Sequence, residues 1–158
     1  IAIEVGLLIA MFLFMKRVAE TTKISVVTKE LDLSGEGDIT HTEEVLSLPE
    51  KVEVYEIDGP FFFGIANKFD DIMHNMGNKP IIRIIRMRKV PFIDSTGIKN
   101  LGNLCNRSKK EKIQVILSGV SPEVYATLER SGFVDKLGRE FIFDHITKAM
   151  DKANELLK

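Results

Sequence analysis

The chain has 158 residues, 44% of them hydrophobic, which is enough for one domain with a sizeable core. Its formal net charge of −1 leaves no basic surplus to neutralise phosphates, so nucleic acid is not an expected partner. The single cysteine, Cys105, excludes an internal disulfide framework and suits a reducing compartment.

Residues 1–15 are apolar except for Glu4, and Lys16 and Arg17 follow at once. A bilayer core needs roughly 20 apolar residues as a helix, so this stretch is too short to span alone. Residues 1–17 are therefore predicted to be the C-terminal end of a transmembrane helix. Since the chain begins with Ile and not with Met, it is expected to be a fragment of a longer protein. The Lys-Arg pair marks that end as cytoplasmic. A signal peptide is disfavoured because its positive residues precede the apolar stretch. The other alternative is an amphipathic dimerisation helix.

Residues 18–49 are predicted to be a linker. The stretch 30–44 is acidic and contains two glycines and no aromatic residue, so it buries little surface. Within the linker, residues 24–28 have the composition of a short strand. The folded domain is expected to cover residues 50–158.

Strand and helix patterns alternate from Val52 onwards. Strand patterns cover 52–58, 61–63, 81–90, 113–117 and 141–143, and helical spacing of apolar residues covers 65–76, 98–105, 122–131 and 146–157. Ser121 is expected to cap its helix with Pro122 in the first turn, Gly132 to end that helix, and Asp144 to cap the last one. This order predicts an α/β sandwich with a mostly parallel, mixed β-sheet and about four helices.

Two loops are expected at the carboxyl ends of strands, where sites gather in such sheets. They are Asp94–Gly97 and Gly119–Pro122, and we expect them to be neighbours. In the first loop, Asp94-Ser95-Thr96-Gly97 places two hydroxyls and a carboxylate at a helix N-terminus, where free N–H groups and a partial positive charge favour an anion. Asp94, Ser95, Thr96 and Gly97 form a candidate interaction loop.

The hydroxyls of this loop have two interpretations. Structural capping of the helix is the simpler one. The other is phosphorylation, because a phosphate on Thr96 or Ser95 would be held by the same helix N-terminus. Thr96 and Ser95 are therefore candidate phosphorylation sites.

The cationic group Arg83, Arg86, Arg88 and Lys89 also has two interpretations. It forms an anion-binding face, or its members lie at separate places along one strand and its exit, partly solvated. The second is favoured because strand side chains alternate between faces.

Other motifs argue against catalysis. His41, His74 and His145 lie in separate segments without ligand spacing, so no metal site is predicted. The sequence has no Walker loop, no G-x-G-x-x-G and no Ser-His-Asp arrangement, so we predict no catalytic residue and no cofactor. Cys105 lies on an apolar helix face and is expected in the core.

Several segments resemble one family. Asp94-Ser95-Thr96-Gly97 resembles the Asp-Ser-(Ser/Thr)-Gly loop of STAS domains, which occur in anti-sigma factor antagonists and in the cytosolic tails of SulP-family anion transporters. Residues 58–69 are similar to the Gly-Pro-x-Phe-Phe segment of SulP-type STAS domains, residues 84–97 to their most recognisable segment, and residues 131–133 to their late Ser/Ala-Gly-Phe turn. The resemblance covers about residues 50–158. The second hydroxyl of the loop is the phosphoacceptor in the antagonists, which carries over to Thr96.

The resemblance implies a non-enzymatic regulatory domain of a secondary anion transporter for sulfate, bicarbonate or a dicarboxylate, at the cytoplasmic face of the inner (cell) membrane. Its implied partners are the membrane domain of its own transporter, a cytosolic protein or kinase, and a second copy in a homodimer. The alternative is a free-standing anti-sigma factor antagonist switched by phosphorylation, and residues 1–17 discriminate against it. A small nucleotide-binding enzyme is disfavoured because no phosphate loop is present.

Overall fold

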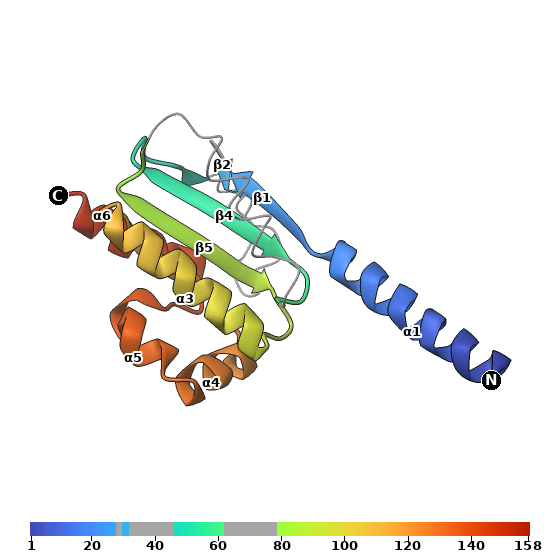
Figure 1. Cartoon of the computed structure of the whole chain (residues 1–158). Coiled ribbons are helices and arrows are strands. Elements are labelled where there is room, and N and C mark those ends of the chain that lie inside the picture. The colour runs from blue at the N-terminus through green and yellow to red at the C-terminus, as the bar shows by residue number, and fades with distance from the viewer. Residues whose placement is uncertain (28–29, 32–45, 62–78) are drawn as a thin grey trace.

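The computed structural model describes residues 1–27, 30–31, 46–61 and 79–158 (Figure 1). The strands are β1 (Lys23–Val27), β2 (Glu30–Leu31), β3 (Leu46–Ser47), β4 (Val52–Asp58), β5 (Ile82–Lys89) and β6 (Gln114–Ser118). The helices are α1 (Ala2–Thr21), α3 (Ser95–Lys110), α4 (Pro122–Arg130), α5 (Phe133–Leu137), the 3₁₀ helix η1 (Arg139–Phe141) and α6 (Ile146–Leu156). The predicted helix over 65–76 and the rest of the predicted strand after Phe61 lie outside the described residues.

The main sheet has four strands in the order β1-β4-β5-β6. Strands β4, β5 and β6 run parallel, and β1 pairs antiparallel with β4. All residues of β5 from Ile82 to Met87 are buried, as expected for a central strand that is covered on both faces. The predicted α/β fold with a mostly parallel, mixed sheet is confirmed, as is the short strand expected at 24–28, which is β1.

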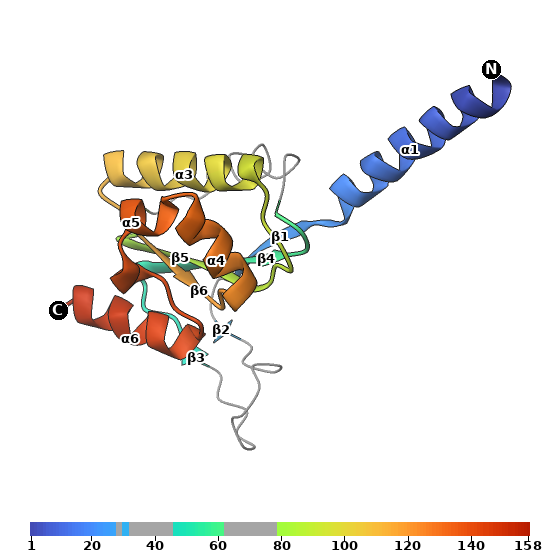
Figure 2. The same cartoon turned by 90° about the horizontal axis from the view of Figure 1, so that it is seen from below.

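Helices cover both faces of the sheet (Figure 2). Helices α3, α4 and α5 lie over one face, on a core that includes Tyr55, Ile85 and Leu117. Helix α6 lies under the other face, on a smaller core that includes Val54 and Ile84. The two cores take alternate residues of β4 and β5, because successive strand side chains point to opposite faces.

Two local predictions near the C-terminus are wrong. Residues 141–143 do not form a strand: η1 ends at Phe141, and only one bridge joins Ile142 to Leu117. Asp144 does not cap α6, because its carboxylate pairs with Lys148 at 2.8 Å. The His145 ring caps the helix instead, accepting from the backbone N–H of Thr147.

Helix α1 extends away from the sheet (Figure 1), and the side chains of residues 1–17 are exposed. Large apolar side chains are among them, including Leu7, Phe12 and Phe14. No helix within the described residues has both the length and the apolar character that crossing a membrane requires.

Gly97 allows α3 to approach the sheet closely. A Cβ atom at Gly97 would overlap the carbonyl oxygen of Phe61 and lie 2.9 Å from Ile93 Cγ1. The backbone oxygen cannot move aside as the end of a flexible side chain can. Gly102 lies one and a half turns further along α3 and differs: its Cβ would meet only Lys136 Nζ, at 3.8 Å.

We predict that Gly97→Ala destabilises the fold by about 1–3 kcal/mol, because the added methyl group forces α3 away from Phe61. Gly102→Ala is the matched control in the same helix. It should be neutral or stabilising by about 0.5–1 kcal/mol, because alanine favours helix over glycine. Urea unfolding of both variants measures the difference. Equal stabilities would contradict the close approach.

Candidate functional site

The loop between β5 and α3 is fixed by one bridge and one cap. Ile93 forms a parallel bridge with Phe61. Asp94 has an extended backbone, and its Oδ1 accepts a hydrogen bond from the Gly97 N–H at 2.6 Å. The cap satisfies one of the free N–H groups of the helix, which explains why α3 begins at Ser95.

Ser95 and Thr96 are the first two residues of α3, and both are exposed. Their hydroxyls lie beside the positive end of the helix dipole. Gly97, by contrast, is buried on the side of α3 that faces the sheet. The four residues of the candidate interaction loop are thus brought together with the two hydroxyls facing solvent, and phosphorylation of either one stays a prediction.

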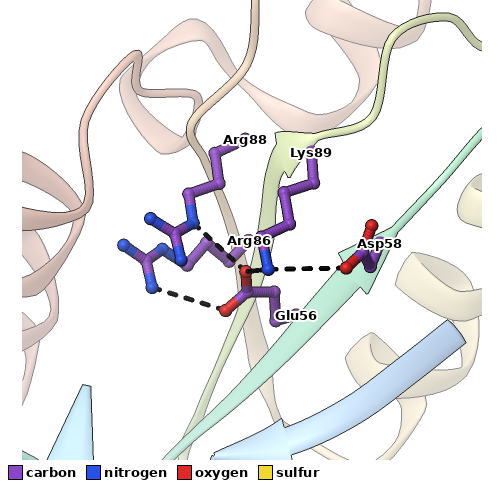
Figure 3. A network of polar contacts seen from close by, with 5 residues as sticks. All are labelled: Glu56, Asp58, Arg86, Arg88 and Lys89. Atoms are coloured by element: carbon purple, nitrogen blue, oxygen red, sulfur yellow. Dashed lines mark hydrogen bonds and ion pairs between the residues drawn. The ribbon is translucent and has the colours of Figure 1, made fainter. Parts of the chain in front are cut away.

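Three cations at the end of β5 converge on one carboxylate of β4 (Figure 3). Glu56 Oε2 lies 3.4 Å from Arg86 Nη1, and Glu56 Oε1 lies 3.1 Å from Arg88 Nε and 3.3 Å from Lys89 Nζ. The Lys89 ammonium also reaches Asp58 Oδ2, at 3.4 Å. The cluster lies at the carboxyl end of the sheet, the end at which β4, β5 and β6 stop.

A register shift between β4 and β5 explains why Lys89 joins Arg88. Glu56 pairs with Arg86, but Asp58 pairs with Lys89, so β5 has one more residue than β4 in this interval. Such a bulge interrupts the alternation of side chains between faces. Strict alternation would have sent Arg88 and Lys89 to opposite faces.

The prediction that the four cations are partly solvated is wrong for Arg83 and Arg86, which are 5% and 0% exposed. Arg83 belongs to the α3 face of the sheet, where its Nη1 donates to Ser108 Oγ at 2.9 Å. Its guanidinium lies 5.5 Å from the centre of the Tyr55 ring. Arg83 is therefore separate from the cluster around Glu56, and the four cations do not form one anion-binding face.

Two buried acids in these groups have shifted pKa values. Burial raises the pKa of the Tyr55 hydroxyl to about 12, despite the positive charge of Arg83. Burial also opposes ionisation of Glu56. The hydrogen bond and charge of Arg88, together with the charge of Arg86, outweigh it and hold the pKa of Glu56 below its ordinary value.

The loop after β6 lies against the end of β5. Gly119 has a φ of +67°, and a Cβ there would lie 2.8 Å from the backbone nitrogen of Arg88. Ser121 caps α4 as predicted, its Oγ accepting from the Val124 N–H at 3.3 Å. The second loop therefore lies beside the last residues of β5, the strand that leads into the first loop.

The end of α1 is tied to the same end of the sheet. Thr22 is fully buried, and its hydroxyl donates to the carbonyl of Pro60 at 2.9 Å. The next residue, Phe61, donates its N–H to Phe92 O at 3.1 Å, and Asp94 donates its own to Phe61 O at 3.4 Å. A short series of hydrogen bonds thus joins Thr22 to the cap of α3.

Neither Glu56 nor Thr22 was predicted to be a site residue. The signal for Glu56 was present, because it is an acid inside an apolar strand whose parallel neighbour carries arginines. Thr22 gives no local signal, since its partner is 38 residues away. His145 caps α6, whereas His41 and His74 lie outside the described residues. Within those described residues, no group of three His, Cys, Asp or Glu could hold a metal ion.

We predict that Glu56→Gln destabilises the domain at pH 7 by about 1–3 kcal/mol, because the buried Arg86 then loses the negative charge of Glu56. The folded-state pKa of Glu56 is lowered, so its contribution is complete above the unfolded value of about 4.3 and disappears as pH falls through the folded value. The deficit of the variant should therefore shrink in acid.

Urea unfolding at a series of pH values from neutral to acid measures this. Asp58→Asn is the control, because the Asp58 carboxylate is half exposed and its ion pair within the described residues is with the exposed Lys89. A Glu56→Gln deficit that stays constant across the series would contradict the ionic role of Glu56.

Comparisons with known proteins identify the fold family. The family model of the STAS domain matches residues 45–149. Sulfate transporter 1.3 of Arabidopsis thaliana is 27% identical over 172 aligned positions, which cover 99% of this chain and 26% of that protein. The chain spans about a quarter of the length of the curated relatives it matches.

Solved structures agree. A sulfate transporter family protein from Wolinella succinogenes is 42% identical with a TM-score of 0.67, covering 71% of this chain and 92% of that one. The SulP transporter STAS domain of Vibrio cholerae is 32% identical with a TM-score of 0.63, covering 70% and 87%. A Thermotoga maritima protein assigned as an anti-sigma factor antagonist shares the fold alone, at 18% identity and a TM-score of 0.55, covering 67% and 90%. The chain therefore belongs to the STAS domain family, together with the STAS domains of SulP-type sulfate transporters.

Proposed function

We propose that the chain is the non-enzymatic regulatory and interaction domain of a secondary anion transporter, with sulfate, bicarbonate or a dicarboxylate as the transported class. The observation that carries this proposal is the likeness to STAS domains of sulfate transporters, at 42% and 32% identity. The anion pathway is assigned to a membrane domain and not to the residues of this chain.

Helix α1 supports a link to the membrane. Its exposed apolar side chains and the Lys16-Arg17 pair fit the cytoplasmic end of a transmembrane helix. We assign residues 1–17 to that end and place the rest of the chain at the cytoplasmic face of the cell membrane. Because β1 pairs with β4, the globular unit in this proposal starts at Thr22 and not at residue 50.

In this arrangement the candidate interaction loop faces the membrane. Thr22 is bonded to Pro60 at the carboxyl end of the sheet, and the Asp94 cap lies at that same end. A membrane helix that continues into Thr22 would bring Ser95 and Thr96 towards the membrane. The first proposed partner is therefore the membrane domain of the same transporter. A cytosolic protein or kinase and a second copy of the chain stay predictions.

The second candidate function is a phosphorylation-switched anti-sigma factor antagonist. The exposed Thr96 at the start of α3 is the observation in its favour. Two observations weigh against it: the lower identity to the Thermotoga protein, at 18%, and the apolar α1, for which a free-standing switch has no use.

We predict that Thr96→Asp leaves the fold intact and changes transport by the full-length protein. A carboxylate at a helix N-terminus interacts with the dipole by about 0.3–1 kcal/mol, so the melting temperature should move by no more than about 4 °C. It also adds a negative charge beside Asp94, which alters any interface formed by the loop. The measurement is thermal unfolding together with uptake of labelled sulfate, bicarbonate and a dicarboxylate into vesicles.

Asn103→Asp is the matched control, because it adds the same charge at an exposed position further along α3. If Thr96→Asp leaves uptake unchanged, the proposed regulatory role of Thr96 is wrong. A full-length protein that transports none of these anions would contradict the transporter proposal itself.

A truncation series tests where the globular unit starts. We predict that a chain beginning at Thr22 unfolds cooperatively with an unchanged midpoint, because the side chains of residues 1–17 are exposed. A chain beginning at Glu30 also lacks β1 and should lose at least about 2 kcal/mol, because Ile24 and Val26 pack against the core. If the two chains are equally stable, β1 is dispensable. If the first chain does not fold, α1 belongs to the domain.

A further inference from the structure

A cavity of about 300 Å³ lies at the opposite end of the sheet from the candidate interaction loop. It lies between the second half of α3, α5, η1 and the start of β6, and it is partly open to solvent. The residues that line it are Cys105, Asn106, Lys109, Ile113, Gln114, Val115, Phe133, Lys136, Leu137 and Phe141. Its volume lies at the lower end of the range for small-molecule sites.

The polar groups of this cavity are cationic or neutral. Lys109 and Lys136 bring two ammonium groups, Asn106 and Gln114 bring amides, and no carboxylate lines the wall. Within the described part of the chain, neither lysine's ammonium group forms an ion pair or a hydrogen bond. The remaining wall is apolar, with the rings of Phe133 and Phe141 among its members. The cavity thus combines an uncompensated positive charge with a hydrophobic surface.

The Lys136 side chain lies against α3. Its Nζ lies 3.8 Å from the point where a Cβ on Gly102 would stand, so the absent side chain leaves room for it. Burial raises the pKa of the Cys105 thiol to about 12, and the nearby charge of Lys136 opposes that rise. The ammonium group therefore lies close to Cys105, on one side of the cavity.

We propose that this cavity binds a small organic carboxylate with an apolar body. Lys136 and Lys109, both exposed residues of the lining, hold the carboxylate through charge-assisted hydrogen bonds. The hydrocarbon part packs on Phe133, Phe141 and Val115. The site is independent of the proposed transporter function, because it shares no residue with the candidate interaction loop or the cluster around Glu56.

The test is a ¹⁵N NMR titration of the whole chain with 3-phenylpropionate. Saturable shifts are expected at the backbone amides of Cys105, Gln114, Val115 and Lys136. Three further probes separate the parts of the ligand: 3-phenylpropylammonium has the same body with the opposite charge, acetate has the head without the body, and sulfate is an inorganic anion.

Lys136→Gln should weaken binding of 3-phenylpropionate by about tenfold, the effect of losing one charge-assisted hydrogen bond. Lys110→Gln is the matched control, because it removes the same charge from an exposed position of α3 that does not line the cavity. Four results would overturn the proposal: shifts confined to other residues, equal binding of the ammonium analogue, equal binding of acetate or sulfate, or equal affinities of the two lysine variants and the unmodified chain.

Discussion

The contact between Gly97 and the carbonyl of Phe61 determines the geometry of the carboxyl end of the sheet. Because Gly97 has no side chain, the first turn of α3 rests on the backbone at the Phe61–Ile93 bridge. This places Asp94 where its carboxylate reaches the Gly97 N–H, and it leaves the hydroxyls of Ser95 and Thr96 on the outside. Any other residue at position 97 would separate α3 from the sheet. Both the cap at Asp94 and the exposure of the two hydroxyls depend on the contact between α3 and the sheet.

The cluster around Glu56 has a different role from the cap. A buried ion pair gives little net stability, because removing two charges from water costs about as much as their attraction returns. Its effect is on specificity: a register of β4 and β5 that moved Glu56 away would remove this partner from the buried Arg86. The register shift before Asp58 then adds Arg88 and Lys89 to the same carboxylate. The cluster therefore fixes the strand alignment on which both loops at the carboxyl end depend.

The sequence predicted those features whose cause is local. Strand β4, the cap at Ser121 and the start of α3 after Asp94 each follow from residues within a few positions, and the structure has them there. Burial of Arg83 and Arg86 was missed because it depends on partners in other elements, Ser108 in α3 and Glu56 in β4. Alternation alone could not place Lys89 beside Arg88, since a bulge has no reliable local signature. At the last helix, Asp144 and His145 are both able to cap, and the choice depends on Lys148, which pairs with Asp144.

A series of hydrogen bonds runs from Thr22 through Phe61 to Asp94. This series limits how the proposed membrane helix is able to influence the candidate interaction loop. Thr22 is held by Pro60, and Phe61 is held on both sides by backbone bonds to Phe92 and Asp94. A movement of α1 that kept these bonds would carry the carboxyl end of the sheet with it as one body. A movement that broke them would expose the buried hydroxyl of Thr22, next to the first pair of β1 and β4. The fold therefore favours rigid coupling over local rearrangement of the loop, so a signal at Thr96 would reach the membrane domain through a change in the docking of the whole domain.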